Sequence, residues 1–136
     1  MLDKLIIAID FDGTIVEDAY PAIGEEKIFA FDTIKRLQKD GHRIILWTYR
    51  HGEKLEEAVA FCKKNGVEFY AVNKNYNEEV YDQSIPRKLG ADIFIDDRNI
   101  GGFIGWGIIY QQLTKEEPPK REKKKGFFSF LNPGND

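Results

Sequence analysis

Three short apolar runs, each followed at once by polar residues, constrain the fold of this chain most strongly. They occupy residues 5–9, 44–47 and 93–95. Unbroken apolar runs of this length are typical of strands that are covered on both faces. Between them, residues 25–39 and 53–65 carry apolar side chains at helical spacing, and each segment is followed by a glycine. The chain therefore alternates strand and helix.

The remaining segments complete this pattern. Residues 67–72 predict a third strand, 85–89 a short helical turn, and 106–113 an additional strand or helix, whereas 73–82 has no clear periodicity. Such alternation predicts a three-layer α/β sandwich with helices on both faces of a Rossmann-like, mainly parallel sheet of four or five strands.

The charge distribution suggests where the folded domain ends. Residues 1–113 contain 14 basic and 19 acidic side chains, whereas the residues from Lys115 onward contain six basic and four acidic ones. Pro118-Pro119 and the basic run that follows are typical of a solvated linker. We expect a single domain over 1–113, then a charged linker and an aromatic tail over 114–136. The tail's aromatic cluster would dock on the same protein, on a second copy in a possible homo-oligomer, or on a membrane surface or partner groove.

Composition excludes several other classes. The net charge of −3 gives no strong nucleic-acid signal, and no apolar run is long enough for a transmembrane segment. The single cysteine, Cys62, cannot form an internal disulfide, which suits a reducing compartment. We therefore expect a cytoplasmic protein.

The polar residues that follow the apolar runs carry the chemistry. They are Asp10 and Asp12, then Thr48, then Asp96 and Asp97. In open parallel sheets, ligands bind beyond the carboxyl ends of the strands, so these side chains should share one cleft. Clustered carboxylates repel unless they are protonated or a cation neutralises them, and oxygen ligands favour Mg²⁺, which commonly bridges protein and phosphate oxygens. The sequence therefore predicts a magnesium site for a phosphorylated substrate.

Such a site has the groups that phosphoryl transfer requires. A carboxylate can attack phosphorus, and a second acid can protonate the leaving oxygen and later activate water. The hydroxyl of Thr48, the ammonium of Lys88 and backbone N–H groups near Gly13 are candidates to bind the charged oxygens of the phosphoryl group.

Four segments, in order, make the resemblance specific. The stretch IIAIDFDGT at 6–14, IILWT at 44–48, the lysine in PRKLGAD and IFIDD at 93–97 resemble the four motifs of the haloacid dehalogenase superfamily. Arg87 is a weaker match than Lys88 for the third motif. The resemblance covers positions 5–102, about three quarters of the chain.

The resemblance implies a role for each matching residue. Asp10 would be the nucleophile, forming an aspartyl-phosphate, and also a metal ligand. Asp12 would be the general acid/base, with its backbone carbonyl on the metal. Thr48 and Lys88 would hold the phosphoryl group. Of the acidic pair, Asp97 would bind Mg²⁺ directly and Asp96 directly or through water.

The resemblance also implies which member of the superfamily this is. An acid two residues after the nucleophile is the phosphatase pattern, and haloalkanoate dehalogenases lack it. Only 35 residues separate Asp12 from Thr48, and 39 separate Thr48 from Lys88, so neither gap holds a cap domain. We expect a capless phosphomonoester hydrolase that acts on a small molecule or on an exposed phosphate of a larger one.

Some alternatives remain open. The same residues suit a phosphotransferase of this superfamily, a non-enzymatic phosphoacceptor domain of receiver type, or a phosphate-ligand binding protein without turnover. Tyr49, Arg50 and His51 either contact the leaving group or form a polar loop into the next helix. No loop carries a signature for sugar, nucleotide or protein substrates.

Overall fold

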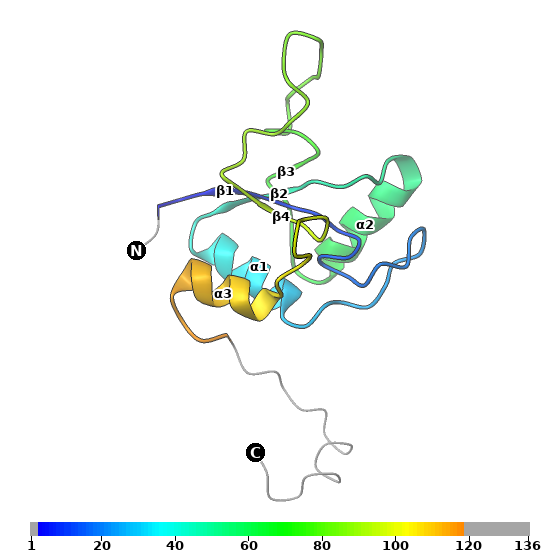
Figure 1. The fold of residues 1–136 in the computed structure, drawn as a ribbon. Helices are drawn as coiled ribbons and strands as arrows, with labels where there is room; N and C mark the ends of the chain where they lie inside the picture. Colours follow the sequence, from blue (N-terminus) through cyan, green and yellow to red (C-terminus); the bar gives the residue numbers. More distant parts are fainter. Residues whose placement is uncertain (1–2, 119–136) are drawn as a thin grey trace, which may run out of the picture.

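The computed structural model describes residues 3–118, which form one four-stranded sheet with three helices (Figure 1). The strands are β1 (Ile6–Ile9), β2 (Arg43–Leu46), β3 (Ala71–Val72) and β4 (Ile93–Ile95). All three pairings are parallel and the strand order is β3-β2-β1-β4. The fold is therefore the small Rossmann-like α/β fold that the alternation of elements predicts.

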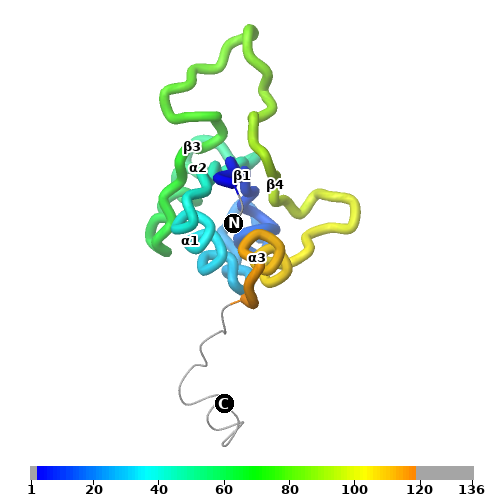
Figure 2. Tube along the Cα trace, turned by 90° about the vertical axis from the view of Figure 1, so that its left-hand side faces the viewer, coloured from blue at the N-terminus to red at the C-terminus, as the bar shows by residue number. Residues whose placement is uncertain are grey.

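All three helices pack on one face of the sheet: α1 (Ala30–Lys39), α2 (Gly52–Lys64) and α3 (Trp106–Thr114). Their apolar side chains join Ile7 and Ile9 of β1 in the larger of two buried cores. Phe61 of α2 contacts the ring of Phe31 of α1, with ring centroids 5.9 Å apart. Figure 2 shows the helices gathered on one side of β1.

The opposite face of the sheet has a smaller core, and its cover is irregular. Ala8 and Ile45 lie there beneath Leu89 and Ala91, which belong to the segment that joins β3 to β4. Right-handed crossovers from β1 to β2 and from β2 to β3 run in the same direction and place both helices on one face. The crossover from β3 to β4 runs the opposite way and covers the other face, but it contains no helix. The third layer is therefore a loop, where the sequence predicts a helix.

Much of that connection, residues 73–92, projects away from the sheet in both views (Figures 1 and 2), whereas its end returns to the sheet with Leu89 and Ala91. It contains no helix or strand: the predicted helical turn at 85–89 is absent, and a turn lies just before it, where the Ile85 N–H bonds to the Asp82 carbonyl at 3.3 Å. Neither gap between the motifs holds a cap domain in the described part of the chain.

The first helix is shorter than its periodicity predicts. It begins at Ala30 instead of residue 25, because the chain around Glu25 pairs with the segment after β1: the Glu17 N–H bonds to the Glu25 carbonyl at 2.7 Å. Phe29 then adopts a left-handed conformation, φ 68°, which breaks any continuous helix. Glu26 still serves the helix start, accepting a hydrogen bond from the Phe31 N–H at 3.1 Å.

The last described helix ends close to the expected end of the domain, which stays a prediction. α3 ends at Thr114, one residue past the predicted boundary. The aromatic tail that was predicted to dock or anchor lies outside the described residues. Within residues 3–118, no helix combines the length and the apolar character needed to cross a membrane.

Candidate active site

The carboxyl ends of three adjacent strands bring the predicted polar residues together. Asp10 follows β1, Thr48 lies two residues beyond β2, and the acidic pair follows β4. Hydrogen bonding between neighbours continues past the strand ends, with the Asp10 N–H 3.0 Å from the Ile95 carbonyl and the Trp47 N–H 2.8 Å from the Ile9 carbonyl. These bonds set the register in which the side chains converge.

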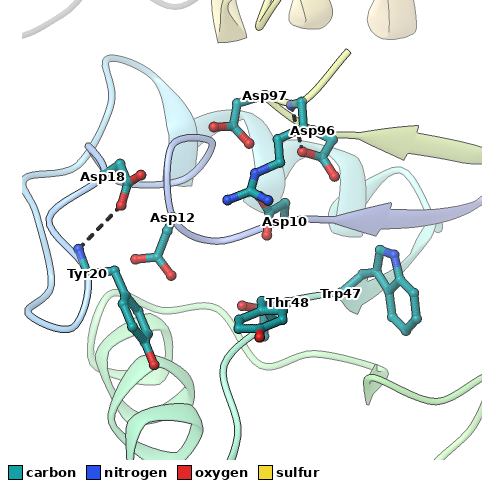
Figure 3. A pocket seen from close by; sticks show the side chains of 10 residues that line it. Asp10, Asp12, Asp18, Tyr20, Trp47, Thr48, Asp96 and Asp97 are labelled. Carbon is teal, nitrogen blue, oxygen red and sulfur yellow. Dashed lines mark hydrogen bonds between the residues drawn. The ribbon is translucent and has the colours of Figure 1, made fainter.

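The residues converge on a cavity of about 620 Å³ at this edge (Figure 3). In Figure 3, Asp96 and Asp97 lie above Asp10, Asp12 lies to its left, and Thr48 lies below it. The cavity is lined by Asp10, Asp12, Asp18, Tyr20, Trp47, Thr48, Tyr49, Asp96, Asp97 and Arg98. Five of the seven predicted site residues are therefore in one place.

Three of the carboxylates are close enough to share a cation. One oxygen each from Asp10, Asp96 and Asp97 lie within 4.8 Å of one another. Oδ1 of Asp97 is buried and has no hydrogen-bond partner among the described residues. A buried, unpaired carboxylate oxygen is costly, so this atom fits a metal ligand better than a structural acceptor. The trio suits a hard divalent cation such as Mg²⁺.

Gly13 makes room for Asp97. An ideal Cβ on Gly13 would lie 2.2 Å from Oδ2 of Asp97, and the residue has φ +82°. Its N–H bonds to the Val16 carbonyl at 2.8 Å, closing the turn that follows β1. Gly13 does not line the cavity, so its predicted phosphate contact stays a prediction, while its close approach to Asp97 is a second reason for glycine here.

The electrostatics of Asp10 reflect this crowding. Burial raises the pKa of Asp10 from 3.8 to about 8, and the negative charge of Asp96, a side-chain hydrogen bond with Asp97 and the charge of Asp97 add to the shift. A hydrogen bond from the Phe11 N–H opposes it. In the absence of a cation, Asp10 therefore holds its proton near neutral pH, and a bound cation would favour the ionised, nucleophilic form.

Asp12 has a partner that sequence reasoning missed. The Nε and Nη2 atoms of Arg50 lie 2.8 and 2.7 Å from the two oxygens of Asp12, a bidentate ion pair. The Arg50 side chain is fully buried, whereas that of Asp12 is 17% exposed toward the cavity. Of the two interpretations left open for Arg50, the polar loop that leads into α2 describes its position, but its side chain is buried against Asp12.

Thr48 is held by both neighbouring segments. Its N–H donates to Oδ1 of Asn73 at 2.8 Å, just after β3, and its hydroxyl oxygen accepts from the Arg50 N–H at 3.2 Å. Asn73 has φ 54°, a left-handed conformation in which its side chain turns back to Thr48. The backbone after β2 is thereby fixed at the cavity.

Lys88 is the predicted residue that the structure does not bring to the site. It is exposed, its ammonium lies 5.6 Å from the centroid of the Phe94 ring, and it does not line the cavity. It belongs to the irregular 73–92 segment, whose path the motif spacing does not determine. Among the described residues that line the cavity, Arg98 is the one cation.

Arg98 directly follows the acidic pair and lines the cavity. Its N–H donates to Oδ1 of Asp96 at 2.9 Å, which turns the chain immediately after β4. Asp18 and Tyr20 come from the loop after β1, where the Tyr20 N–H bonds to Oδ1 of Asp18 at 3.3 Å (Figure 3). No periodic pattern marks these loop residues, and only the path of the loop brings them to the cavity.

Comparison with known proteins gives one clear relative. No protein-family model matches the chain, and no curated protein matches it. A solved structure of a conserved protein from Bacteroides thetaiotaomicron is 56% identical, with a TM-score of 0.79, and the match covers 83% of this chain and 92% of that one. At this identity over most of both chains, the protein belongs to the same family as that conserved Bacteroides protein.

Proposed function

We propose that the protein is a magnesium-dependent phosphomonoester hydrolase that acts through an aspartyl-phosphate on Asp10. The observation that carries the proposal is the carboxylate trio at the sheet edge, with oxygens within 4.8 Å of one another, and the buried, unpaired Oδ1 of Asp97. The order of the four segments, which resemble the haloacid dehalogenase motifs, supports the same conclusion.

In this proposal, Asp10, Asp96 and Asp97 hold the Mg²⁺ ion. When bound, the ion neutralises charge on the phosphoryl oxygens and on the carboxylates around it. The three carboxylates line a cavity that is open to solvent, so water and substrate oxygens have room to complete the coordination of the ion. The backbone carbonyl of Asp12 is the further ligand that the motif resemblance implies.

The chain's own residues would then perform two steps. An oxygen of Asp10 attacks phosphorus, the bond from phosphorus to the leaving oxygen breaks, and Asp12, which enters this step in its protonated form, gives that oxygen its proton. Next, Asp12 takes a proton from water, which attacks the aspartyl-phosphate and releases inorganic phosphate and free Asp10. The Thr48 hydroxyl binds a phosphoryl oxygen through both steps. Lys88 would join it only if the 73–92 segment came closer to the cavity.

The substrate we propose is a phosphomonoester carried by a small molecule or exposed on a larger one, in the cytoplasm. A cavity of about 620 Å³ without a cap is accessible to a bulky leaving group. Tyr20 and Tyr49, 47% and 90% exposed, stand at its rim, where either ring can pack on such a group.

The test is phosphate release from 4-nitrophenyl phosphate with Mg²⁺ and with EDTA. We expect turnover that requires the metal, and no measurable turnover in Asp10→Asn, because an amide oxygen is too weak a nucleophile. Asp18→Asn is the matched control: Asp18 also lines the cavity but lies outside the carboxylate trio, so this variant should stay active.

Other outcomes would point elsewhere. Undiminished turnover in Asp10→Asn would contradict the mechanism. A phosphoryl adduct that persists without turnover would indicate a receiver-type phosphoacceptor. Transfer to an added alcohol in preference to water would indicate a phosphotransferase.

A further inference from the structure

Arg50 is the most completely enclosed charged side chain of the site. Its exposed fraction is 1%, although it lies in the short loop between β2 and α2. Burying a guanidinium is costly unless its donors are paired, so its partners indicate what the residue is for.

All five N–H groups of the guanidinium have an acceptor. Nε and Nη2 bind the two oxygens of Asp12, and Nη2 also donates to the Ala22 carbonyl at 2.8 Å. Nη1 lies 3.3 Å from the Pro21 carbonyl and 3.4 Å from the Lys54 carbonyl. A guanidinium has five donors in a fixed plane, so this set of acceptors determines its orientation completely.

Two aromatic rings pack against the same group. The guanidinium carbon lies 5.1 Å from the ring centroid of Phe11 and 5.1 Å from that of Tyr20. Arg50 thus connects the end of β1, the loop at 20–22 and the first turn of α2. The hydrogen bond to Asp12 raises the pKa of Arg50 above its already high ordinary value, so the group stays charged.

This arrangement has a direct consequence for Asp12. A bidentate pair fixes both the position and the plane of the carboxylate, and a carboxylate has about four lone-pair positions, so acceptor capacity remains on both oxygens. The Asp12 side chain stays 17% exposed on the cavity side. The Arg50 pair therefore presents Asp12 to the cavity in one orientation.

We propose that Arg50 is a positioning residue that holds the Asp12 carboxylate in the orientation needed for proton transfer to the leaving oxygen; this proposal rests on the function proposed above. Arg50 does not line the cavity and touches no reacting atom. Arg50 affects the reaction by orienting Asp12. Its loss should therefore affect proton transfer selectively, which a general loss of structure would not do.

The test compares two substrates that differ in how much they need a general acid. The leaving group of phenyl phosphate requires protonation more than that of 4-nitrophenyl phosphate. In Arg50→Lys, which keeps the charge and loses the bidentate geometry, kcat on phenyl phosphate should fall on the order of 10²-fold, the usual contribution of a positioned acid. kcat on 4-nitrophenyl phosphate should fall much less. KM for both substrates, and the stabilisation of the folded protein by Mg²⁺, should change little.

Arg50→Ala with added guanidinium ion is the second variant. At low, non-denaturing concentrations guanidinium should restore part of the phenyl phosphate activity by occupying the site of the missing side chain. Arg36→Lys is the matched control, because Arg36 also forms a bidentate pair, with Glu116 at 2.9 Å, but does not line the cavity. It should not change the ratio of the two rates.

An equal loss on both substrates, with no response to guanidinium, would show that Arg50 is only structural and would overturn the proposal. A wild-type protein that releases phosphate from neither substrate would instead remove the proposed reaction, and the role of Arg50 with it. The two failures are distinguished by the wild-type rate alone.

Discussion

At the scale of single residues, one glycine lies against the carboxylates of the site. Gly13 lies in the turn after β1 with φ +82°, and Oδ2 of Asp97 occupies the space where a Cβ would be. Non-glycine residues in this backbone region cost about 1–3 kcal/mol. The steric conflict between an added Cβ and Asp97 adds to that strain, and it would displace Asp97 from the carboxylate trio.

Gly13→Ala should therefore reduce both Mg²⁺ binding and turnover. We expect the rise in melting temperature that Mg²⁺ causes in the wild type to be largely lost, because Asp97 must move. Gly102→Ala is the matched control: Gly102 has φ +76° with nothing within 4 Å of an added Cβ, so it tests the strain without the conflict. Equal loss of the Mg²⁺ effect in both variants would contradict this account.

The sequence predicts single residues well where a strand positions them. Asp10, Thr48 and the acidic pair directly follow apolar strand patterns, and parallel strands present their carboxyl ends at one edge. Lys88 follows a long segment without periodicity, so no spacing rule places it. Arg50 is the opposite case: it lies at the site, but the sequence does not predict its role. Its partner and its burial depend on how the loop around Pro21 folds over it.

At the scale of elements, α3 connects the end of the chain's described part to the turn after β1. The indole Nε1–H of Trp106, which is 1% exposed, donates to the Thr14 carbonyl at 2.7 Å. The sequence predicts a strand or a helix for this segment, because its apolar residues fit either period. The sequence also predicts too early a start for α1, at residue 25. The apolar spacing continues back through residues that in fact pair with the chain around Glu17.

Trp106→Phe should destabilise the fold and disturb the site. Loss of the indole leaves the Thr14 carbonyl without its donor, which costs about 1–3 kcal/mol, and the smaller ring leaves a gap beside Phe103. Urea denaturation measures the loss. Trp47→Phe is the control, since Trp47 is only partly buried and has no such hydrogen bond in the described chain. The account fails if Trp106→Phe costs no more than Trp47→Phe.

At the scale of the whole molecule, the strand order concentrates negative charge at one edge. With β1 between β2 and β4, the acids of two strands come together in a chain whose first 113 residues already carry more acidic than basic side chains. The sequence predicts the parallel sheet but not the strand order, because the order depends on the direction of each crossover. Repulsion among these carboxylates should make stability depend on both pH and Mg²⁺.

The sign of that dependence follows from Asp10, whose pKa rises from 3.8 to about 8 on folding, mainly through burial. Between these values the folded state binds more protons than the unfolded state, so without metal the free energy of unfolding falls as pH rises from about 4 to about 8. Mg²⁺ binds the ionised carboxylates and stabilises the folded state by mass action, so its benefit should grow over the same range.

Asp10→Asn isolates this effect, because the amide does not titrate. In EDTA this variant should be more stable than the wild type at pH 8, should lose less stability between pH 5 and pH 8, and should gain less from Mg²⁺. Chemical denaturation at several pH values, with Mg²⁺ and with EDTA, measures all three. Asp18→Asn, outside the carboxylate trio, should follow the wild-type curve. If the free energy of unfolding falls equally with pH in the wild type and in Asp10→Asn, Asp10 is not the group responsible. The pH dependence then comes from another carboxylate of the cluster.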